Sequence, residues 1–144
     1  MTTITNYSFN IIKEKSALYD ENIIDDEYEL AAKIFADNFK DSDKEIFSII
    51  MLDKHKKIIG INDVSIGSLN ASIVHPREIF KVAITAHAKY IVMGHNHPSG
   101  NLMPSVEDIK TTTRLIKCGN AIGIGVLASL ILGIDGNYDK YTTI

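Results

Sequence analysis

Hydrophobic positions along the first half of the chain change from helical to strand-like spacing. Between residues 25 and 40, apolar side chains recur every three or four positions, and residues 45–52 are mostly apolar and β-rich. The first spacing predicts a helix with one buried face, for which Asp25 and Asp26 are the expected N-cap, and the second predicts a central strand. The charged segment 53–57 then predicts a hairpin tip from which the chain returns as another strand.

The same change of spacing recurs in the second half. Residues 63–73 mix polar and apolar side chains around Gly67 and predict the end of a strand and its turn. Pro76 stands where a first helical turn tolerates proline, and the apolar positions in residues 79–86 predict a helix. The apolar run 90–93 predicts a buried strand.

One more helix and one more strand are expected. Residues 105–118 predict a helix with Ser105 as its N-cap and Gly119 at its end. The uncharged run 121–134 is too short to cross a bilayer and is interrupted by glycines, so it predicts a buried strand rather than a membrane span. Residues 1–22 are polar and irregular and predict an N-terminal arm, followed by one domain over residues 23–144.

Composition limits the chemistry. The 144 residues, 45% of them apolar, are enough for one domain with a core. The single cysteine, Cys118, excludes an internal disulfide and a cysteine-based zinc knuckle and fits a reducing cytoplasm, so any metal must use His, Asp or Glu. Fifteen basic and eighteen acidic side chains give a net charge of -3, which lends no support to nucleic-acid binding. The N-terminus shows no signal-peptide pattern.

The segment 94–100, Gly-His-Asn-His-Pro-Ser-Gly, carries the strongest candidate chemistry. It follows the expected buried strand, and residues two apart in extended backbone point to the same side, so His95 and His97 would share one face. Two imidazoles on one face can bind one metal ion. The other histidines are not expected to bind metal. His55 is expected to be a surface residue in the hairpin tip, and His75 and His87 are expected to have capping or packing roles at the ends of a helix.

Asp108 supports two interpretations. With Ser105 it forms the sequence pattern of a capping box, which is the simpler one. It also lies only a short proline- and glycine-containing loop and one helical turn beyond the two histidines, so a rigid turn would bring it back beside them. Two histidines and an aspartate form a three-ligand set that leaves an open position on zinc. A general base would still be needed, and on spacing alone the candidates are Glu45, Glu78 and Glu107.

These residues resemble a known family. The chain has an upstream glutamate, then His-x-His at residues 95–97, and, after a gap of seven residues, Ser-x-x-Asp at residues 105–108. This pattern looks like the JAB or JAMM metalloprotease motif. The segments 74–81 and 94–109 resemble more closely the bacterial RadC-like JAB domain, and the resemblance extends over residues 45–133.

The resemblance implies both a fold and a site. The implied fold is α/β, a mixed sheet with helices on its faces, related to the cytidine-deaminase architecture. The implied cofactor is Zn²⁺ held by His95, His97 and Asp108. Ser105 would donate a hydrogen bond to the oxyanion, and Glu45, at the start of the strand before the charged hairpin, would act as general base and then acid.

Two features depart from the family pattern. RadC-like domains usually carry Asp-His in the strand after the last helix, where this chain has Ala128 and Ser129. If that pair supports the metal ligands, its loss would weaken metal binding about 10 to 100-fold. Many longer relatives also carry an N-terminal helix-hairpin-helix region, for which this chain has too few residues.

Three functions follow as hypotheses. The leading one is a cytoplasmic zinc-dependent hydrolase of the JAMM metallopeptidase type that cleaves an amide or isopeptide bond in a peptide or protein. The alternative is a weak or inactive metal-binding module associated with DNA repair or mobile elements. The third treats residues 95–97 as an HNH-type nuclease signature, although such sites usually lie in basic surroundings. No sequence feature identifies the substrate. The arm of residues 1–22 could pack on a second copy of the chain, so a homo-oligomer is one of the expected states.

Overall fold

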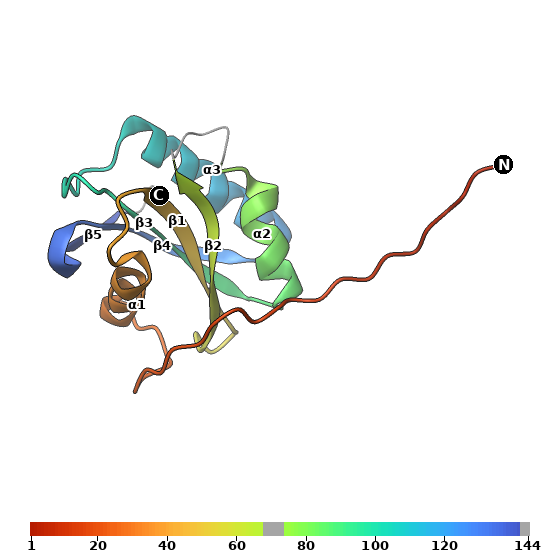
Figure 1. Cartoon of the computed structure of the whole chain (residues 1–144), viewed down its shortest axis with the longest axis horizontal. Coiled ribbons are helices and arrows are strands. Elements are labelled where there is room, and N and C mark those ends of the chain that lie inside the picture. Colours follow the sequence, from red (N-terminus) through yellow and green to blue (C-terminus); the bar gives the residue numbers. More distant parts are fainter. Residues whose placement is uncertain (68–73, 142–144) are drawn as a thin grey trace.

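The computed structural model describes residues 1–67 and 74–141. Its centre is one mixed sheet with the strand order β2-β1-β3-β4-β5 (Figure 1). The strands are β1 (Glu45–Leu52), β2 (Ile58–Gly67), β3 (Tyr90–Asn96), β4 (Gly125–Leu132) and β5 (Tyr138–Tyr141). Strands β3 and β4 pair in parallel, and the remaining pairs are antiparallel. The expected central strand over residues 45–52 is therefore confirmed.

Helices cover both faces of this sheet. Helix α1 (Glu29–Phe39) packs on one face, and helices α2 (Pro76–Thr85) and α3 (Val106–Ile122) pack on the other. A short 3-10 helix, η1 (Ile134–Gly136), joins β4 to β5. Helix α3 is the crossover between parallel β3 and β4, so it begins beside the carboxyl end of β3. The expected α/β fold with a mixed sheet and helices on its faces is confirmed.

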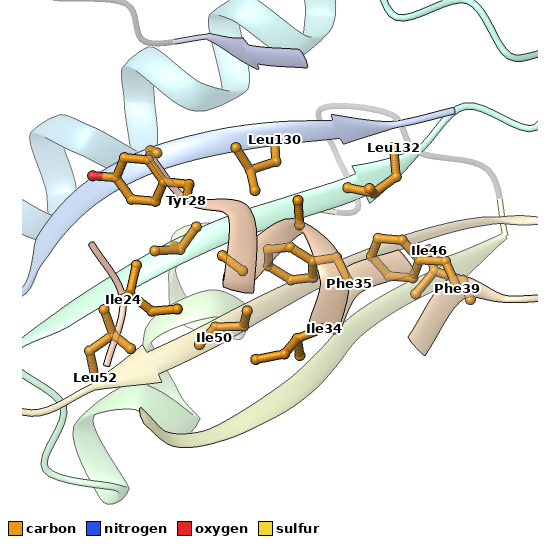
Figure 2. Close-up of a cluster of buried hydrophobic side chains, with 14 residues drawn as sticks. Ile24, Tyr28, Ile34, Phe35, Phe39, Ile46, Ile50, Leu52, Leu130 and Leu132 are labelled. Carbon is orange, nitrogen blue, oxygen red and sulfur yellow. The ribbon is translucent and has the colours of Figure 1, made fainter. Parts of the chain in front are cut away.

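The core on the α1 face packs the helix closely against the sheet. Phe35, fully buried in α1, lies over the strands in Figure 2 among aliphatic side chains of β1 and β4. A Cβ at Gly94 of β3 would lie 2.6 Å from the Phe35 ring. Glycine is therefore required at residue 94 for α1 to approach this close to the strand that carries His95.

Two predicted helix ends are wrong. Helix α1 begins after Tyr28, whose φ of 62° is left-handed; the Asp25 carboxylate accepts hydrogen bonds from the backbone N–H groups of Glu27 and Tyr28, so it stabilises the turn before the helix. Helix α3 continues past Gly119 and ends at Gly123, with φ 81°. Gly119 is buried, and a Cβ there would collide with the Ile124 carbonyl oxygen, so this glycine permits close packing instead of ending the helix.

Other segments differ from expectation in extent. The run 121–134 is strand only from Gly125 to Leu132, and β5 was not predicted. The strand expected to end near residues 63–73 reaches Gly67, and its turn lies outside the described residues. Residues 1–18 are exposed and extend away from the sheet (Figure 1), and the first pairing is an isolated bridge between Ile23 and Lys57. Within the described ranges, no helix has the length and apolar character to span a membrane.

Candidate metal centre

Strand β3 brings the two histidines together at its carboxyl end. His95 is 1% exposed and occupies the face covered by α2 and α3, where Phe47 of β1 stacks on its ring. The backbone N–H of His97 donates to the Leu132 carbonyl, so extended pairing with β4 continues one residue beyond the strand. The two Nε2 atoms are 3.1 Å apart. The predicted placement of both side chains on one face is confirmed.

Asp108 completes a three-residue group. Its Oδ1 lies 3.3 Å from His95 Nε2 and its Oδ2 lies 3.3 Å from His97 Nε2. One ligand atom from each residue lies within 4.8 Å of the others, close enough to hold one metal ion. The aspartate comes from the first turn of α3, which begins beside the end of β3 because α3 is the crossover to β4.

The capping interpretation of Asp108 is confirmed as well. The Ser105 hydroxyl accepts from the Asp108 backbone N–H at 3.0 Å, and Asp108 Oδ2 accepts from the Ser105 backbone N–H at 2.8 Å. This reciprocal pair fixes the carboxylate relative to the helix axis. The same two hydrogen bonds that start α3 therefore orient a prospective metal ligand.

The carboxylate of Asp108 is held in its ionised form. Burial alone would raise its pKa, but the hydrogen bond with His95, the backbone and side-chain hydrogen bonds with Ser105 and the charge interaction with His95 outweigh this, and the net pKa is well below the ordinary value. An ionised carboxylate is the form that binds metal.

The tautomer of His97 also suits metal binding. Its Nδ1 lies 2.6 Å from the Asn101 carbonyl oxygen, which only an N–H can approach as a hydrogen-bond donor. With the proton on Nδ1, Nε2 carries the lone pair that a metal would use, and this atom lies 3.3 Å from Asp108 Oδ2 and 3.1 Å from His95 Nε2. His95 differs, since its Nδ1 is buried without a hydrogen-bond partner among the described residues.

An open cleft of about 450 Å³ lies over this group. It is lined by Glu45, His97, Ser105, Asp108 and five residues of the loop between them, Pro98, Ser99, Asn101, Met103 and Pro104. Four of the five site residues expected from the sequence thus face one cleft, and the fifth, His95, contacts two of them.

The two other glutamates considered as the base lie in different surroundings. Glu78 pairs with Lys81 along α2, with a 2.6 Å N–O distance, and Glu107 pairs with Lys110 along α3 at 4.0 Å. Neither is among the residues that line the cleft. Of the three candidates, only Glu45 lies beside His97 and Asp108.

Asn96 is a residue that the search for ligands missed. It points to the opposite face from the histidines, where its Oδ1 accepts from the Ile46 N–H at 2.6 Å and its Nδ2 donates to the Lys44 carbonyl at 2.9 Å. These two backbone groups flank Glu45, so Asn96 holds the start of β1 against the end of β3. The sequence feature that could have identified it is its position between the two histidines. Side chains alternate between the two faces of a strand, so the side chain of Asn96 points away from those of His95 and His97.

The remaining histidines lie outside the group. His75 caps α2, its Nδ1 accepting from the Arg77 backbone N–H at 3.2 Å, which confirms the capping role. Its pKa is lowered by desolvation and by the nearby Arg77 and Arg114 guanidinium groups. His55 is exposed, as expected for the hairpin tip, and His87 is exposed just beyond the end of α2.

The positions that depart from the family pattern face opposite sides of the sheet. Ala128 belongs to the core beneath α1, away from the metal-binding group. Ser129 lies on the other face, opposite Met93 of β3 and Tyr141 of β5. Its hydroxyl is buried and meets no partner at hydrogen-bonding geometry among residues 1–67 and 74–141. Only Ser129 therefore bears on the metal-binding face.

The chain is similar to several curated proteins named UPF0758. It is 56% identical over 95 residues to one from Alkaliphilus oremlandii, covering 66% of this chain and 40% of the relative. It is 54% identical over 90 residues to one from Caldanaerobacter subterraneus, covering 62% and 39%, and 47% identical over 109 residues to one from Clostridioides difficile, covering 76% and 46%. The chain thus spans less than half the length of these relatives.

The family comparison covers most of the chain. The model of the RadC-like JAB domain matches residues 25–141, which contain strands β1 to β5, helices α1 to α3 and the group of His95, His97 and Asp108. The chain therefore belongs to the RadC-like JAB domain family.

Proposed function

We propose that this protein is a zinc-dependent hydrolase of the JAMM metallopeptidase type, which cleaves an amide or isopeptide bond with water. The observation that carries the proposal is the convergence of His95, His97 and Asp108 within 4.8 Å at a cleft that Glu45 also lines. A catalytic zinc site needs three protein ligands, an open position and a nearby general base, and the residues around this cleft can supply all three.

The donor set fits zinc. Two imidazole nitrogens and one carboxylate oxygen are ligands that zinc accepts, and the proton on His97 Nδ1 leaves Nε2 available. When bound, zinc would lower the pKa of water to about 7 and polarise a carbonyl oxygen. Because the Asp108 carboxylate is already ionised, binding would require no proton loss from it.

Glu45 and Ser105 have complementary roles in this proposal. Glu45, half-buried at the start of β1, would accept a proton from the attacking water and pass it to the leaving amine. Ser105 uses an oxygen lone pair to accept from the Asp108 N–H, so its own hydroxyl proton remains to be donated to the oxyanion. Its capping function and its catalytic function therefore use different parts of one hydroxyl.

A peptide or protein substrate would meet both apolar and polar groups in the cleft. Its loop side presents Pro98, Met103 and Pro104 together with the polar Ser99 and Asn101. Apolar contacts with a few placed polar groups are typical of sites that bind and orient organic ligands.

We place the protein in a reducing compartment, the cytoplasm, because its single cysteine is unpaired.

The test combines metal content with hydrolysis. Zinc-loaded protein should bind one equivalent of zinc and cleave members of a peptide and isopeptide library. Glu45→Gln should retain zinc and lose at least 100-fold of the rate, whereas Glu78→Gln, which alters a carboxylate paired with Lys81, should leave the rate unchanged. If Glu45→Gln cleaves a found substrate as fast as the original protein, the proposed mechanism is wrong.

A second candidate function is a metal-binding module without hydrolysis, associated with DNA repair or mobile elements. The observation that favours it is the unpartnered Ser129 hydroxyl on the metal-binding face, where relatives usually have a longer polar side chain. Stoichiometric zinc binding together with salt-dependent DNA retention, and no cleavage of any library member, would support this candidate over the hydrolase.

A further inference from the structure

We propose that Ser129 is a positioning residue for His95: when zinc is bound, its hydroxyl accepts the hydrogen bond of His95 Nδ1–H, directly or through one water molecule. Tyr141 and Thr112 support Ser129 in this role. The inference rests on the proposed zinc site and assigns the residue that orients its most deeply buried ligand.

The sheet register brings the two side chains to neighbouring positions. Residues 93 and 95 of β3 lie opposite residues 129 and 131 of β4, so Ser129 is the diagonal neighbour of His95 on the adjacent strand. Met93 belongs to the core beneath α2 and α3, and alternation places His95 and Ser129 on that same face. A diagonal pair across two strands is separated by a gap that a histidine ring and one water can bridge.

The two atoms have complementary hydrogen-bonding requirements. His95 Nδ1 and Ser129 Oγ are both buried and both without a partner at hydrogen-bonding geometry in the described parts of the chain. If His95 binds zinc through Nε2, the proton must stay on Nδ1, which then has to donate. Histidine ligands of metals almost always donate this second N–H to an oxygen. A serine oxygen, with two lone pairs, can accept it.

Tyr141 holds the serine from the other side. It lies directly opposite Ser129 in the β4–β5 ladder, and Thr112 of α3 donates to its hydroxyl oxygen at 3.0 Å. Because that oxygen accepts from Thr112, the Tyr141 proton remains for Ser129. Burial raises the pKa of Tyr141, Ser129 and Thr112 act to lower it, and the charge of Asp108 raises it, so these groups form one buried polar cluster.

This cluster connects Ser129 to both sides of the metal site. Thr112 lies one helical turn after Asp108, so the hydroxyl series Thr112–Tyr141–Ser129 runs from the helix carrying one ligand to the strand beside another. It provides a polar environment for His95 by a route that does not require the Asp-His pair usual in relatives. Ala128 cannot take part because it faces α1.

The test measures zinc affinity and zinc-free stability together, in the full chain. Ser129→Ala should weaken Zn²⁺ binding about 10 to 100-fold in competition with a chelator, the range typical of losing a group that orients a ligand. In zinc-free protein the same change should lower the melting temperature less than Ser48→Ala does, because Ser129 Oγ has no partner at full hydrogen-bonding geometry among the described residues, whereas the Ser48 hydroxyl is bonded to Asp63. Tyr141→Phe should weaken zinc binding by a smaller factor.

Ser48→Ala is the matched control. Ser48 is a buried β-strand serine on the opposite sheet face, and its hydroxyl is bonded to Asp63. This change should lower the melting temperature of the zinc-free protein and leave zinc affinity unchanged. A serine with a merely structural role would behave like Ser48.

Three outcomes are distinguishable. Tenfold or greater loss of zinc affinity in Ser129→Ala, with the downfield Nδ1–H proton resonance of His95 present in zinc-loaded protein and lost in the variant, supports the inference. Unchanged zinc affinity, or destabilisation of zinc-free protein as large as in Ser48→Ala, overturns it while leaving the proposed zinc site intact. If the original protein binds no zinc, the proposed function itself fails, and this inference fails with it.

Discussion

Replacing Asn96 with alanine tests how the start of β1 is attached to the metal-binding strand. The side-chain amide of Asn96 is 6% exposed and makes two hydrogen bonds, from the Ile46 N–H at 2.6 Å and to the Lys44 carbonyl at 2.9 Å. These bonds hold the backbone on both sides of Glu45. Asn96→Ala would remove both and leave a buried N–H without its partner.

The expected loss of stability follows from these two contacts. A buried N–H left unsatisfied costs about 1 to 3 kcal/mol, and loss of the bond to Lys44, whose carbonyl can gain water, costs about 0.5 to 1.5 kcal/mol. The sum is about 1.5 to 4.5 kcal/mol. For a chain of this size, each kcal/mol lowers the melting temperature by about 3 to 4 °C, so the expected decrease is about 5 to 18 °C.

Thermal unfolding and amide hydrogen exchange measure the two consequences. Exchange of the Ile46 N–H should accelerate, because its hydrogen-bond acceptor is gone. Asn38→Ala is a suitable control, since it removes an amide that donates to Asp63 at an exposed position, for an expected cost of about 0.5 to 1.5 kcal/mol. A melting temperature in Asn96→Ala at or above that of Asn38→Ala, with unchanged Ile46 exchange, would refute the reasoning.

Three further predictions concern the packing and the ligands. Gly94→Ala places a Cβ 2.6 Å from the buried Phe35 ring and should destabilise the protein by about 1 to 3 kcal/mol in urea unfolding; a neutral effect would mean that α1 does not pack this closely. His97→Ala should abolish stoichiometric zinc binding in a chelator competition, whereas His87→Ala, at an exposed position, should leave it intact; equal zinc loss in both would contradict the assigned ligand set. The pKa of Asp108 is lower in the folded protein than in the unfolded chain, so its stabilising contribution is complete above about pH 4 and is lost as pH falls through the folded value. Urea unfolding of zinc-free protein should therefore show that Asp108→Asn is less stable than the original protein at pH 7, and that this difference in the free energy of unfolding shrinks toward strong acid. A difference that does not change with pH would show that the carboxylate is not held in its ionised form.

The sequence predicted the elements that have a clear period and the site residues that belong to a local motif. The spacing of apolar residues in α1 and the continuous run of β1 are direct consequences of burial, and they appeared where expected. His95 and His97 could be placed on one face because strand geometry alternates. Asp108 could be placed beside the histidines only if the loop of residues 98–104 turns back, and the prolines and the glycine in this loop favoured such a turn.

Glycine roles were harder to predict. Gly119 and Gly123 look alike in sequence, four residues apart at the end of a helix, yet only Gly123 has a left-handed φ. Glycine is needed at residue 119 because the Ile124 carbonyl oxygen approaches the helix there. This contact cannot be inferred from the sequence pattern of the helix itself. The helix therefore extended beyond its expected end because the choice between the two glycines depends on packing against β4.

Contacts between distant segments also escaped prediction. Asn96 binds backbone groups fifty residues away, and the pairing of Tyr141 with Ser129 depends on β5, whose four residues Tyr138–Tyr141 lack a strong apolar alternation. A motif identifies the ligands because they lie close in sequence or follow a fixed spacing. The residues proposed to support the buried ligand, Ser129 and Tyr141, lie on β4 and β5, so their positions relative to His95 follow only from the sheet register.

The most direct test of the zinc site is a crystal of the zinc-loaded protein measured for anomalous scattering at the zinc edge. The account predicts one peak about 2.0 to 2.2 Å from His95 Nε2, His97 Nε2 and an Asp108 carboxylate oxygen, with the Glu45 carboxylate facing the open coordination position. A peak bound by other residues, or no peak at this group after loading, would contradict it.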